Sequence, residues 1–262
     1  MNASHALQDS ATMLRRQLVH IKRYPIVLFT IGIPVIILLL FVYVFGVTMG
    51  AGIAGVSGGR AEYLAYLVPG ILLIAVATGS QMTAIAVSMD MTEGIIARFR
   101  TMSISRSSVL AGHVLSSMLQ TMAAIAAVIG AAVLLGYRPQ ADGAEWLGAI
   151  GLLALVSFAI TWLSVGMGLV TKSVETASNL PMPLMLLPFL GSGFVPTDTL
   201  PSGIRWFAEY QPFTPIMETL RALLEGTSVG SGGPIAVAWC VAIALVGYIW
   251  SRKLYERDPV PK

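Results

Sequence analysis

IVLFTIGIPVIILLLFVYVFGV, residues 26–47, is the stretch that decides the fold. It has no charged residue, and as a helix it is long enough to cross the hydrocarbon core of a bilayer, which requires about 20 apolar residues. It is also about twice as long as the apolar core of a cleavable signal peptide, so we expect it to remain in the mature protein. The stretch therefore predicts an integral membrane protein built from α-helices.

The composition of the whole chain agrees with a membrane location. Of its 262 residues, 56% are hydrophobic and 11% are charged, which is too apolar for an ordinary soluble domain. The net charge is only +3, and no Lys and Arg cluster is interleaved with stacking aromatics, so no nucleic-acid partner is expected. The single cysteine, Cys240, cannot form an internal disulfide.

Five further apolar runs divide the rest of the chain, and together with the first they predict one six-helix domain over residues 25–250. The fifth run contains Pro181, Pro183 and Pro188, which remove backbone donors that hydrocarbon cannot replace. We therefore expect the fifth span to be irregular and to pack against other helices or line a cavity. The predicted spans are 26–47, 63–89, 109–135, 146–170, 180–195 and 234–250.

The distribution of basic residues predicts the orientation. Twelve of the 16 Lys and Arg residues fall in the terminal regions and the even-numbered loops, and four fall in the odd-numbered loops. By the positive-inside rule both termini, including a tail over 251–262, are expected to be cytoplasmic in a multi-pass protein of a bacterial plasma membrane.

Residues 1–24 are expected to form an amphipathic helix before the first span. Their apolar residues recur at spacings of four and three and so share one face, which basic residues flank. Such a helix is suited to lying in the lipid interface, or to packing on a soluble partner, and the two are compatible. The residues of the apolar face are Leu7, Ala11, Leu14, Leu18 and Ile21.

Two absences bear on the source of energy. All 13 acidic residues fall in loops or tails of the predicted topology, whereas ion-coupled carriers usually hold an ionisable residue at bilayer depth. The chain also has no G-x-x-x-x-G-K-[ST] loop to hold nucleotide phosphates. We expect no cofactor and no enzymatic site on this chain. The source of energy is expected to lie on another polypeptide.

The loop over 90–108 has a pattern of its own. Asp90 and Glu93 have the spacing of a capping box, and Ile95, Phe99 and Met102 follow at spacings of four and three. These spacings predict a short amphipathic helix with one apolar and one basic face. It is suited to being held by a cytoplasmic protein, although an interfacial helix with snorkelling arginines is an alternative.

This loop resembles that of the membrane subunits of type 2 ATP-binding-cassette exporters, particularly the daunorubicin-resistance type of permease. The residues that fit the family pattern in order are Glu93-Gly94, Arg98-Phe99-Arg100 and Ser105-Arg106. Ser103 stands where the family usually has Pro, and Ala97 stands where it usually has Glu.

A second and more specific resemblance lies after the fifth span. GFVPTDTLP at 193–201, RWF at 205–207, QPFTP at 211–215 and LRALLEG at 220–226 follow one another as in the same family. The prolines are helix starters and breakers, and the aromatics suit a membrane interface. We expect two short helices within 196–233 that dip back into the outer leaflet, or else loop helices with only a structural purpose.

The resemblance implies a permease that exports an amphipathic small molecule such as a drug, an antibiotic or a lipid-like compound. Two cytoplasmic ATPase subunits would carry ATP and magnesium, and a second copy or a similar permease would complete a dimer. The residues expected to couple to the ATPase are Glu93, Gly94, Ile95, Arg98, Phe99 and Arg100. Those expected to form an extracellular gate are Phe194, Pro196, Pro212, Phe213 and Arg221.

The lining of a pathway is the least determined feature. Residues that mix apolar and hydrogen-bonding character are candidates, although at helical spacing such residues are more often packing groups. An ion-coupled or passive small-solute carrier that needs no ATPase stays as the alternative function. The candidate lining residues are Gln81, Met82, Thr83, Gln120, Thr121, Phe158 and Trp162.

Overall fold

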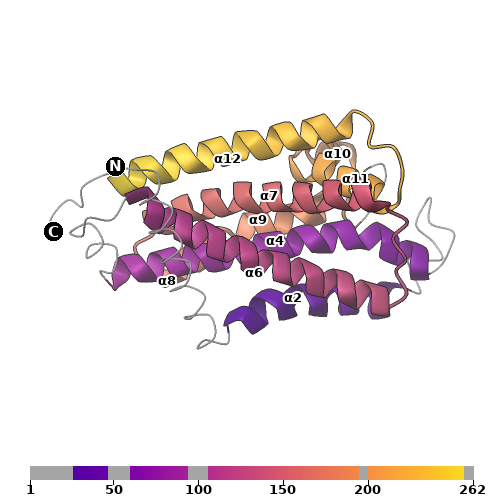
Figure 1. The fold of residues 1–262 in the computed structure, drawn as a ribbon, viewed down its shortest axis with the longest axis horizontal. Helices are drawn as coiled ribbons and strands as arrows, with labels where there is room; N and C mark the ends of the chain where they lie inside the picture. Colours follow the sequence, from indigo (N-terminus) through magenta and orange to yellow (C-terminus); the bar gives the residue numbers. More distant parts are fainter. Residues whose placement is uncertain (1–25, 47–59, 94–105, 195–196, 198–199, 257–262) are drawn as a thin grey trace.

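The computed structural model describes residues 26–46, 60–93, 106–194, 197 and 200–256 (Figure 1). Every regular element in this part of the chain is a helix, as the apolar runs predict. The amphipathic helix predicted over 1–24 and most of the loop helix predicted after Glu93 lie outside the described residues.

Long helices with roughly parallel axes form the body of the molecule (Figure 1). In the described residues, α4, α6, α7 and α12 are each long and apolar enough to cross a membrane by length and composition, and Phe29–Phe45 forms a shorter apolar helix. That shorter helix is α2, which contains Pro34 and ends in a π-helical turn, η1. The bounds are α2 Ile26–Leu40, η1 Phe41–Phe45, α4 Arg60–Thr92, α6 Arg106–Leu134, α7 Gly143–Val170 and α12 Gly232–Glu256.

Helix α4 is the most enclosed of the long helices. Every residue from Leu67 to Ser80 is buried, and the helix packs against α2, α6 and α7. By contrast, α12 exposes a row of large apolar side chains, including Leu245 and Val246, which are 56% and 61% exposed. Such a row would be costly in water and suits contact with lipid chains.

Glycines bring the backbones of α4, α7 and α12 close together. A Cβ atom at Gly168 of α7 would lie 2.6 Å from the carbonyl oxygen of Ala84 in α4. A Cβ at Gly247 of α12 would lie 2.6 Å from the backbone nitrogen of Leu163 in α7. Only glycine leaves room for these approaches, so the three helices form one tightly packed unit.

Two helix ends differ from the apolar runs that predicted them. Helix α7 begins before the predicted span, because Asp142 and Glu145 form a reciprocal capping box with N···O distances of 2.7 and 2.8 Å. Helix α12 continues through Glu256, past the predicted end of the sixth span at Trp250. Ser251 supports that extension by donating from Oγ to the Trp162 carbonyl at 2.9 Å.

The fifth segment, defined here as Val174–Phe194, is broken into short helices. The prolines predicted to interrupt it lie in or beside α9 and the 3₁₀-helical turn η2. The segment begins with a helix capped by Ser173, so it starts earlier than the predicted residue 180. Its parts are α8 Val174–Asn179, α9 Met182–Leu186 and η2 Leu187–Leu190.

Two short helices, α10 Ser202–Tyr210 and α11 Phe213–Leu224, follow within the segment where two were predicted. Most of α10 is exposed, with only Ala208 buried. Helix α11 instead packs against α4, α7 and α12 and buries one whole face, including Phe213 and Leu220. The two helices therefore differ sharply in how firmly the bundle holds them.

Candidate functional site

Arg221 joins three separate parts of the chain. It lies on α11, and its Nη2 atom donates to the Ser192 carbonyl at 2.7 Å and to the Tyr66 carbonyl at 3.2 Å. Its guanidinium also stacks over the Tyr66 ring, with Cζ 4.1 Å from the ring centroid. One side chain thus links α11, the end of the fifth segment and the first turns of α4.

These contacts compensate for the partial burial of a charge. A cation withdrawn from water is costly unless dipoles or counter-charges replace the lost hydration. Two carbonyl oxygens and the face of an aromatic ring do so here. The guanidinium therefore stabilises the contact between these segments only while both carbonyls stay within its reach.

A second polar contact lies one turn beyond Arg221, at the C-terminal end of α11. The Tyr137 hydroxyl donates to Glu225 Oε1 at 3.1 Å, just after α11 ends. Burial of the ring, together with the neighbouring Glu225 carboxylate, raises the pKa of Tyr137 above its ordinary value of 10.0. The phenol therefore keeps its proton near neutral pH and remains a hydrogen-bond donor.

An aromatic cluster lies beside the Arg221 contacts. Phe189 and Phe194 of the fifth segment stack with ring centroids 4.4 Å apart. Phe41 of η1 approaches Phe194 to 4.8 Å, and Phe45 stands 5.3 Å from Phe41. The end of the fifth segment is therefore held to η1 by ring contacts and to α4 by Arg221.

Gln211, the first residue of the QPFTP motif, makes a further contact that the sequence did not predict. Its Nε2 atom donates to the Leu187 carbonyl at 2.9 Å, across the space left by Gly191. A Cβ at Gly191 would lie 2.6 Å from that same nitrogen, and a Cβ at Gly70 would lie 2.8 Å from the Gly193 carbonyl oxygen. Glycines at 191 and 70 thus let the irregular backbone approach both Gln211 and α4.

The predicted gate residues fall in two places. Phe194 and Arg221 lie around residues 191–194, where the contacts above converge. Pro212 caps the start of α11, and Phe213, the first residue of that helix, is 1% exposed in the core. Pro196 lies outside the described residues.

The candidate lining residues divide among three helix contacts. Gln81 donates to the Ser178 carbonyl of the fifth segment at 2.6 Å. Thr83 bonds Ser117 Oγ at 2.5 Å, and Thr121 packs against Gly79, so both lie between α4 and α6. These three side chains hold helices together in the arrangement seen here.

The other candidates lie on different surfaces. Phe158 and Trp162 of α7 meet edge to face, and Trp162 meets Tyr248 of α12 in the same way at 5.0 Å. Gln120 donates to the Ser116 carbonyl within its own helix at 3.3 Å, and Met82 is partly buried. Within one copy of the chain, the seven candidates therefore do not share a single surface.

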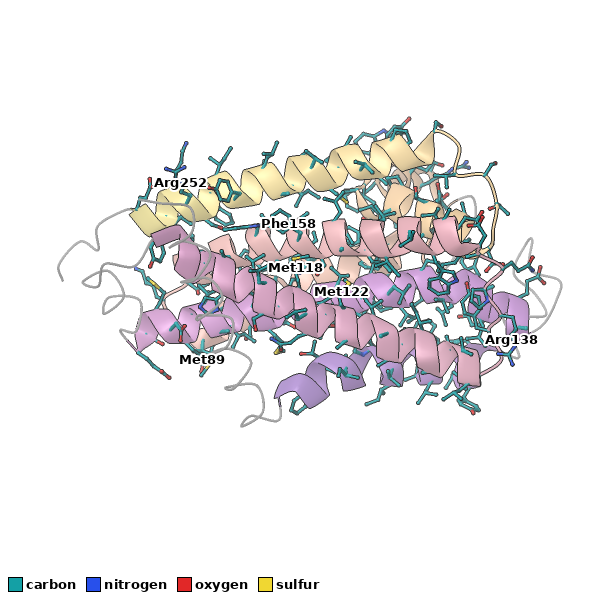
Figure 2. All side chains as sticks on the ribbon, viewed as in Figure 1. Met89, Met118, Met122, Arg138, Phe158 and Arg252 are labelled. Carbon is teal, nitrogen blue, oxygen red and sulfur yellow. The ribbon has the colours of Figure 1, made fainter. Side chains whose placement is uncertain are left out.

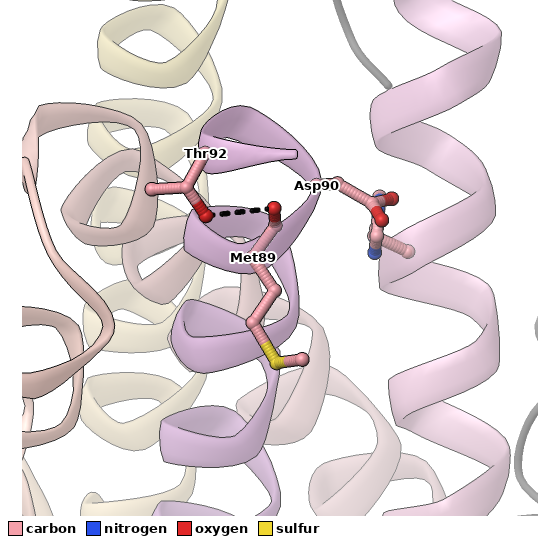
Figure 3. Close-up of polar contacts among 4 residues, drawn as sticks. Met89, Asp90 and Thr92 are labelled. Carbon is pink, nitrogen blue, oxygen red and sulfur yellow. Dashed lines mark hydrogen bonds and ion pairs between the residues drawn. The ribbon is translucent and has the colours of Figure 1, made fainter. Parts of the chain in front are cut away.

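The opposite end of α4 carries a contact between a histidine and an aspartate. His113 Nε2 of α6 lies 3.1 Å from Asp90 Oδ2, with the two side chains 4% and 13% exposed. Helix α4 continues through Thr92, whose hydroxyl donates to the Met89 carbonyl at 3.0 Å, and Asp90 projects from the side facing α6 (Figure 3).

Asp90 therefore does not cap a loop helix, as its spacing to Glu93 predicted, nor does it lie in a loop. Asp90 instead contacts His113 on α6, a partner that the residues next to Asp90 in the sequence could not reveal. Helical residues also occupy both ends of the predicted 90–108 loop, since α6 begins at Arg106. Glu93 follows α4 and is exposed, while the other residues predicted to couple to an ATPase, Gly94, Ile95, Arg98, Phe99 and Arg100, lie outside the described residues.

The Asp90–His113 contact and the Tyr137–Glu225 contact lie at opposite ends of the bundle. Met89, next to Asp90, lies at the same end as Arg252 of α12, and Arg138, next to Tyr137, lies at the other (Figure 2). Ser88 Oγ and Thr171 Oγ1, 3.2 Å apart, add a contact between α4 and the end of α7 at the Asp90 end.

The comparison with a family model and the comparison with individual relatives agree with each other. The model of the family described as ABC-2 type transporter matches residues 9–224, which include Arg221 and the whole fifth segment. A daunorubicin resistance ABC transporter permease protein, DrrB1, of Streptomyces coeruleorubidus is 29% identical over 244 residues, covering 92% of this chain and 83% of the relative. A probable doxorubicin resistance ABC transporter permease protein, DrrC, of Mycobacterium tuberculosis is 25% identical over 180 residues, covering 69% of this chain and 65% of the relative, less than two thirds of its length.

Proposed function

Because the chain belongs to the ABC-2 type transporter family, we propose that it is the permease subunit of an exporter that moves an amphipathic small molecule out of the cell. The family match over residues 9–224 carries this proposal, and the drug-resistance permeases among its relatives support it. The chain is a multi-pass protein of a bacterial membrane. Its apolar bundle and low charge content favour a cargo that is itself largely apolar.

The energy would come from two cytoplasmic ATPase subunits that bind ATP and magnesium. The absence of a phosphate-binding G-x-x-x-x-G-K-[ST] loop in this sequence supports that division of labour. A second copy of the chain, or a similar permease, would complete the membrane unit.

The ATPase would act on the segment that begins at Glu93. In this proposal Glu93, Arg98 and Arg100 meet charged groups of the ATPase, and Phe99 enters an apolar groove. Because Glu93 directly follows α4, and the Asp90–His113 pair ties the end of α4 to the start of α6, a push on this segment would reach both helices.

The outer end would be closed by the segment from residue 189 to α11. The Phe41, Phe189 and Phe194 rings and the Arg221 contacts support this role, because they lie at the end of α4 away from Asp90. In the proposed orientation both termini are cytoplasmic, and α10 and α11 return into the outer leaflet. Pro196, Pro212 and Phe213 would shape this gate through the backbone and the packing of α11.

The proposal is tested by isolating the chain from native membranes with its associated proteins. We expect an ABC ATPase to copurify, and the reconstituted complex to move doxorubicin in an ATP-dependent manner, measured by the fluorescence of the drug in vesicles. Transport of a solute by the chain alone, without ATP, would instead establish the ion-coupled or passive carrier.

A further inference from the structure

From Thr171, at the end of α7, the chain follows α4 in antiparallel register as far as Ser178, and the rest of the fifth segment then departs from it. Seven residues separate Thr171 from Ser178, and seven separate their α4 partners, Ser88 and Gln81. Beyond this point, fifteen residues from Ser178 to Gly193 face only eleven from Gln81 to Gly70. The segment thus holds four more residues than a straight helix of the same length, and the breaks around its prolines accommodate them.

Three long polar side chains donate to backbone carbonyls of this irregular stretch. Gln81 of α4 reaches the Ser178 carbonyl at 2.6 Å, where α8 ends. Gln211, before α11, reaches the Leu187 carbonyl at 2.9 Å, and Arg221 reaches that of Ser192 at 2.7 Å. A helix break leaves carbonyls without helical partners, and side chains from neighbouring helices satisfy them here.

These contacts differ in kind from those that join α4, α7 and α12. There, backbone lies against backbone at Gly168 and Gly247, so any sliding creates steric overlap. A glutamine amide can instead leave one carbonyl and bond water or another acceptor without a clash. The fifth segment also meets α4 backbone to backbone at its end, where a Cβ at Gly70 would lie 2.8 Å from the Gly193 carbonyl oxygen. The stretch from Ser178 to Leu187, which side-chain amides hold, is therefore the part of the bundle that can shift while the other three helices stay together.

Three buried polar atoms beside this segment make a second arrangement accessible. Within the described residues, Ser192 Oγ, Gln211 Oε1 and Arg221 Nε are buried without a hydrogen-bond partner. An unsatisfied buried group raises the free energy of the arrangement that contains it. An arrangement in which these atoms bond water or another group would recover that free energy.

We infer that Gln81 and Gln211 are positioning residues that hold the fifth segment against the α4–α7–α12 unit. Release of the Ser178 and Leu187 carbonyls is the step that lets the segment move during transport. The inference rests on the proposed transport function, and it assigns Gln81 to holding the segment and not to contacting the cargo.

Hydrogen exchange on the full-length chain in phosphatidylglycerol–phosphatidylethanolamine nanodiscs tests the inference. Gln81→Leu and Gln211→Leu are expected to accelerate exchange of amides in 180–194 about 3- to 10-fold, the effect of losing one hydrogen bond. Gln120→Leu is the matched control, because Gln120 bonds only within α6 among the contacts described above, and it should leave these amides unchanged.

Faster exchange confined to 180–194, with α4 and α7 unaffected, supports the inference. Unchanged exchange, or an equal increase throughout the bundle, overturns it. If Gln81→Leu does not insert, Gln81→Asn gives the same test, because its amide is one methylene too short to reach Ser178.

Exchange does not depend on transport, so the two proposals can fail separately. A wild-type complex that transports doxorubicin, with variants of unchanged exchange, would reject the positioning role alone. Accelerated exchange in a chain that transports nothing with ATP would reject the exporter alone.

Discussion

Arg221 illustrates how much one side chain can hold together. Its Nη2 donates to two carbonyls from different segments while its guanidinium plane covers the Tyr66 ring. Lysine keeps the charge but loses both the planar stacking and the fixed geometry of the donors. The site therefore depends on the shape of the guanidinium as well as on its charge.

We predict that Arg221→Gln lowers the free energy of unfolding by about 2 kcal/mol, because buried carbonyls lose a charged donor. Arg221→Lys should cost less but remain measurable. Thermal unfolding in detergent, followed by tryptophan fluorescence, checks both variants. Arg205→Gln is the control, because its pair with Glu209 is exposed and such pairs contribute below about 1 kcal/mol. Equal losses for Arg205→Gln and Arg221→Gln would contradict the role of Arg221.

Gly168 is predicted to be intolerant of even one methyl group. In Gly168→Ala the new Cβ would overlap the Ala84 carbonyl oxygen and press on Val87, so we expect a loss of about 1–3 kcal/mol in stability. Gly151→Ala is the control in the same helix, because nothing lies within 4 Å of its Cβ position. It should be neutral or slightly stabilising, since Ala favours helix. Unfolding midpoints in one detergent compare the two, and matching midpoints would remove the case for a locked α4–α7 contact.

The contact residues show where sequence reasoning stops. Arg221 was assigned a gate role through a family pattern, but Gln211, in the QPFTP motif of the same pattern, was assigned none. Its acceptor is a carbonyl 24 positions away that is free only where the fifth segment breaks. Gly168 is one of 26 glycines, and nothing local distinguishes it. Phe41 and Phe45 did carry a signal, since residues four apart share a helix face.

At the scale of elements, run length predicted the long helices but not where each of them ends. The sixth predicted span ends at Trp250, before Ser251 and Arg252. Helix α12 nevertheless continues, since Ser251 and Tyr255 lie four residues apart and both face the bundle. The capping role predicted for Asp90 was wrong because it relied on the local spacing to Glu93, whereas the observed partner, His113, lies on another helix.

The end of α4 is the element at which we predict coupling to the ATPase. Glu93→Gln and Arg98→Ala should leave membrane insertion and ATP hydrolysis in place while lowering transport. Loss of a charged hydrogen bond of about 1.5–3 kcal/mol corresponds to a decrease of roughly 10- to 100-fold. The measurement is the ratio of drug transported to ATP hydrolysed in reconstituted vesicles.

Arg252→Ala is the control for coupling. Arg252 lies at the same end of the bundle, but its pair with Glu256 is exposed and stays within α12 (Figure 2). We expect this variant to keep the wild-type ratio. Normal ratios in Glu93→Gln and Arg98→Ala as well would place coupling elsewhere.

At the scale of the whole molecule, composition was sufficient for an all-helical membrane protein but not for its arrangement. The central position of α4 follows from burial on every side, which no hydropathy pattern distinguishes from lipid contact. The outward faces of α6 and α12 are apolar as well, with Leu119 of α6 50% exposed. A face buried in the bundle and a face exposed to lipid are both apolar in the sequence. Which helices are neighbours can therefore be seen only in the structure.

The number of crossings depends on the fifth segment, and introduced cysteines test it. Cys240 is the single cysteine of the sequence and is buried. A Cys240→Ala background therefore carries no thiol besides the one introduced. Lys172 and Ser202 flank the segment, Arg138 follows α6, and all three are exposed.

In right-side-out vesicles we expect a membrane-impermeant maleimide to label Arg138→Cys and Ser202→Cys, and to label Lys172→Cys only after the membrane is opened. This pattern follows if residues 174–194 cross the bilayer once, because an irregular helix whose free carbonyls are satisfied by Gln81, Gln211 and Arg221 can span hydrocarbon. Labelling of Lys172→Cys and Ser202→Cys from the same side would leave the segment on one face of the membrane and reduce the number of crossings.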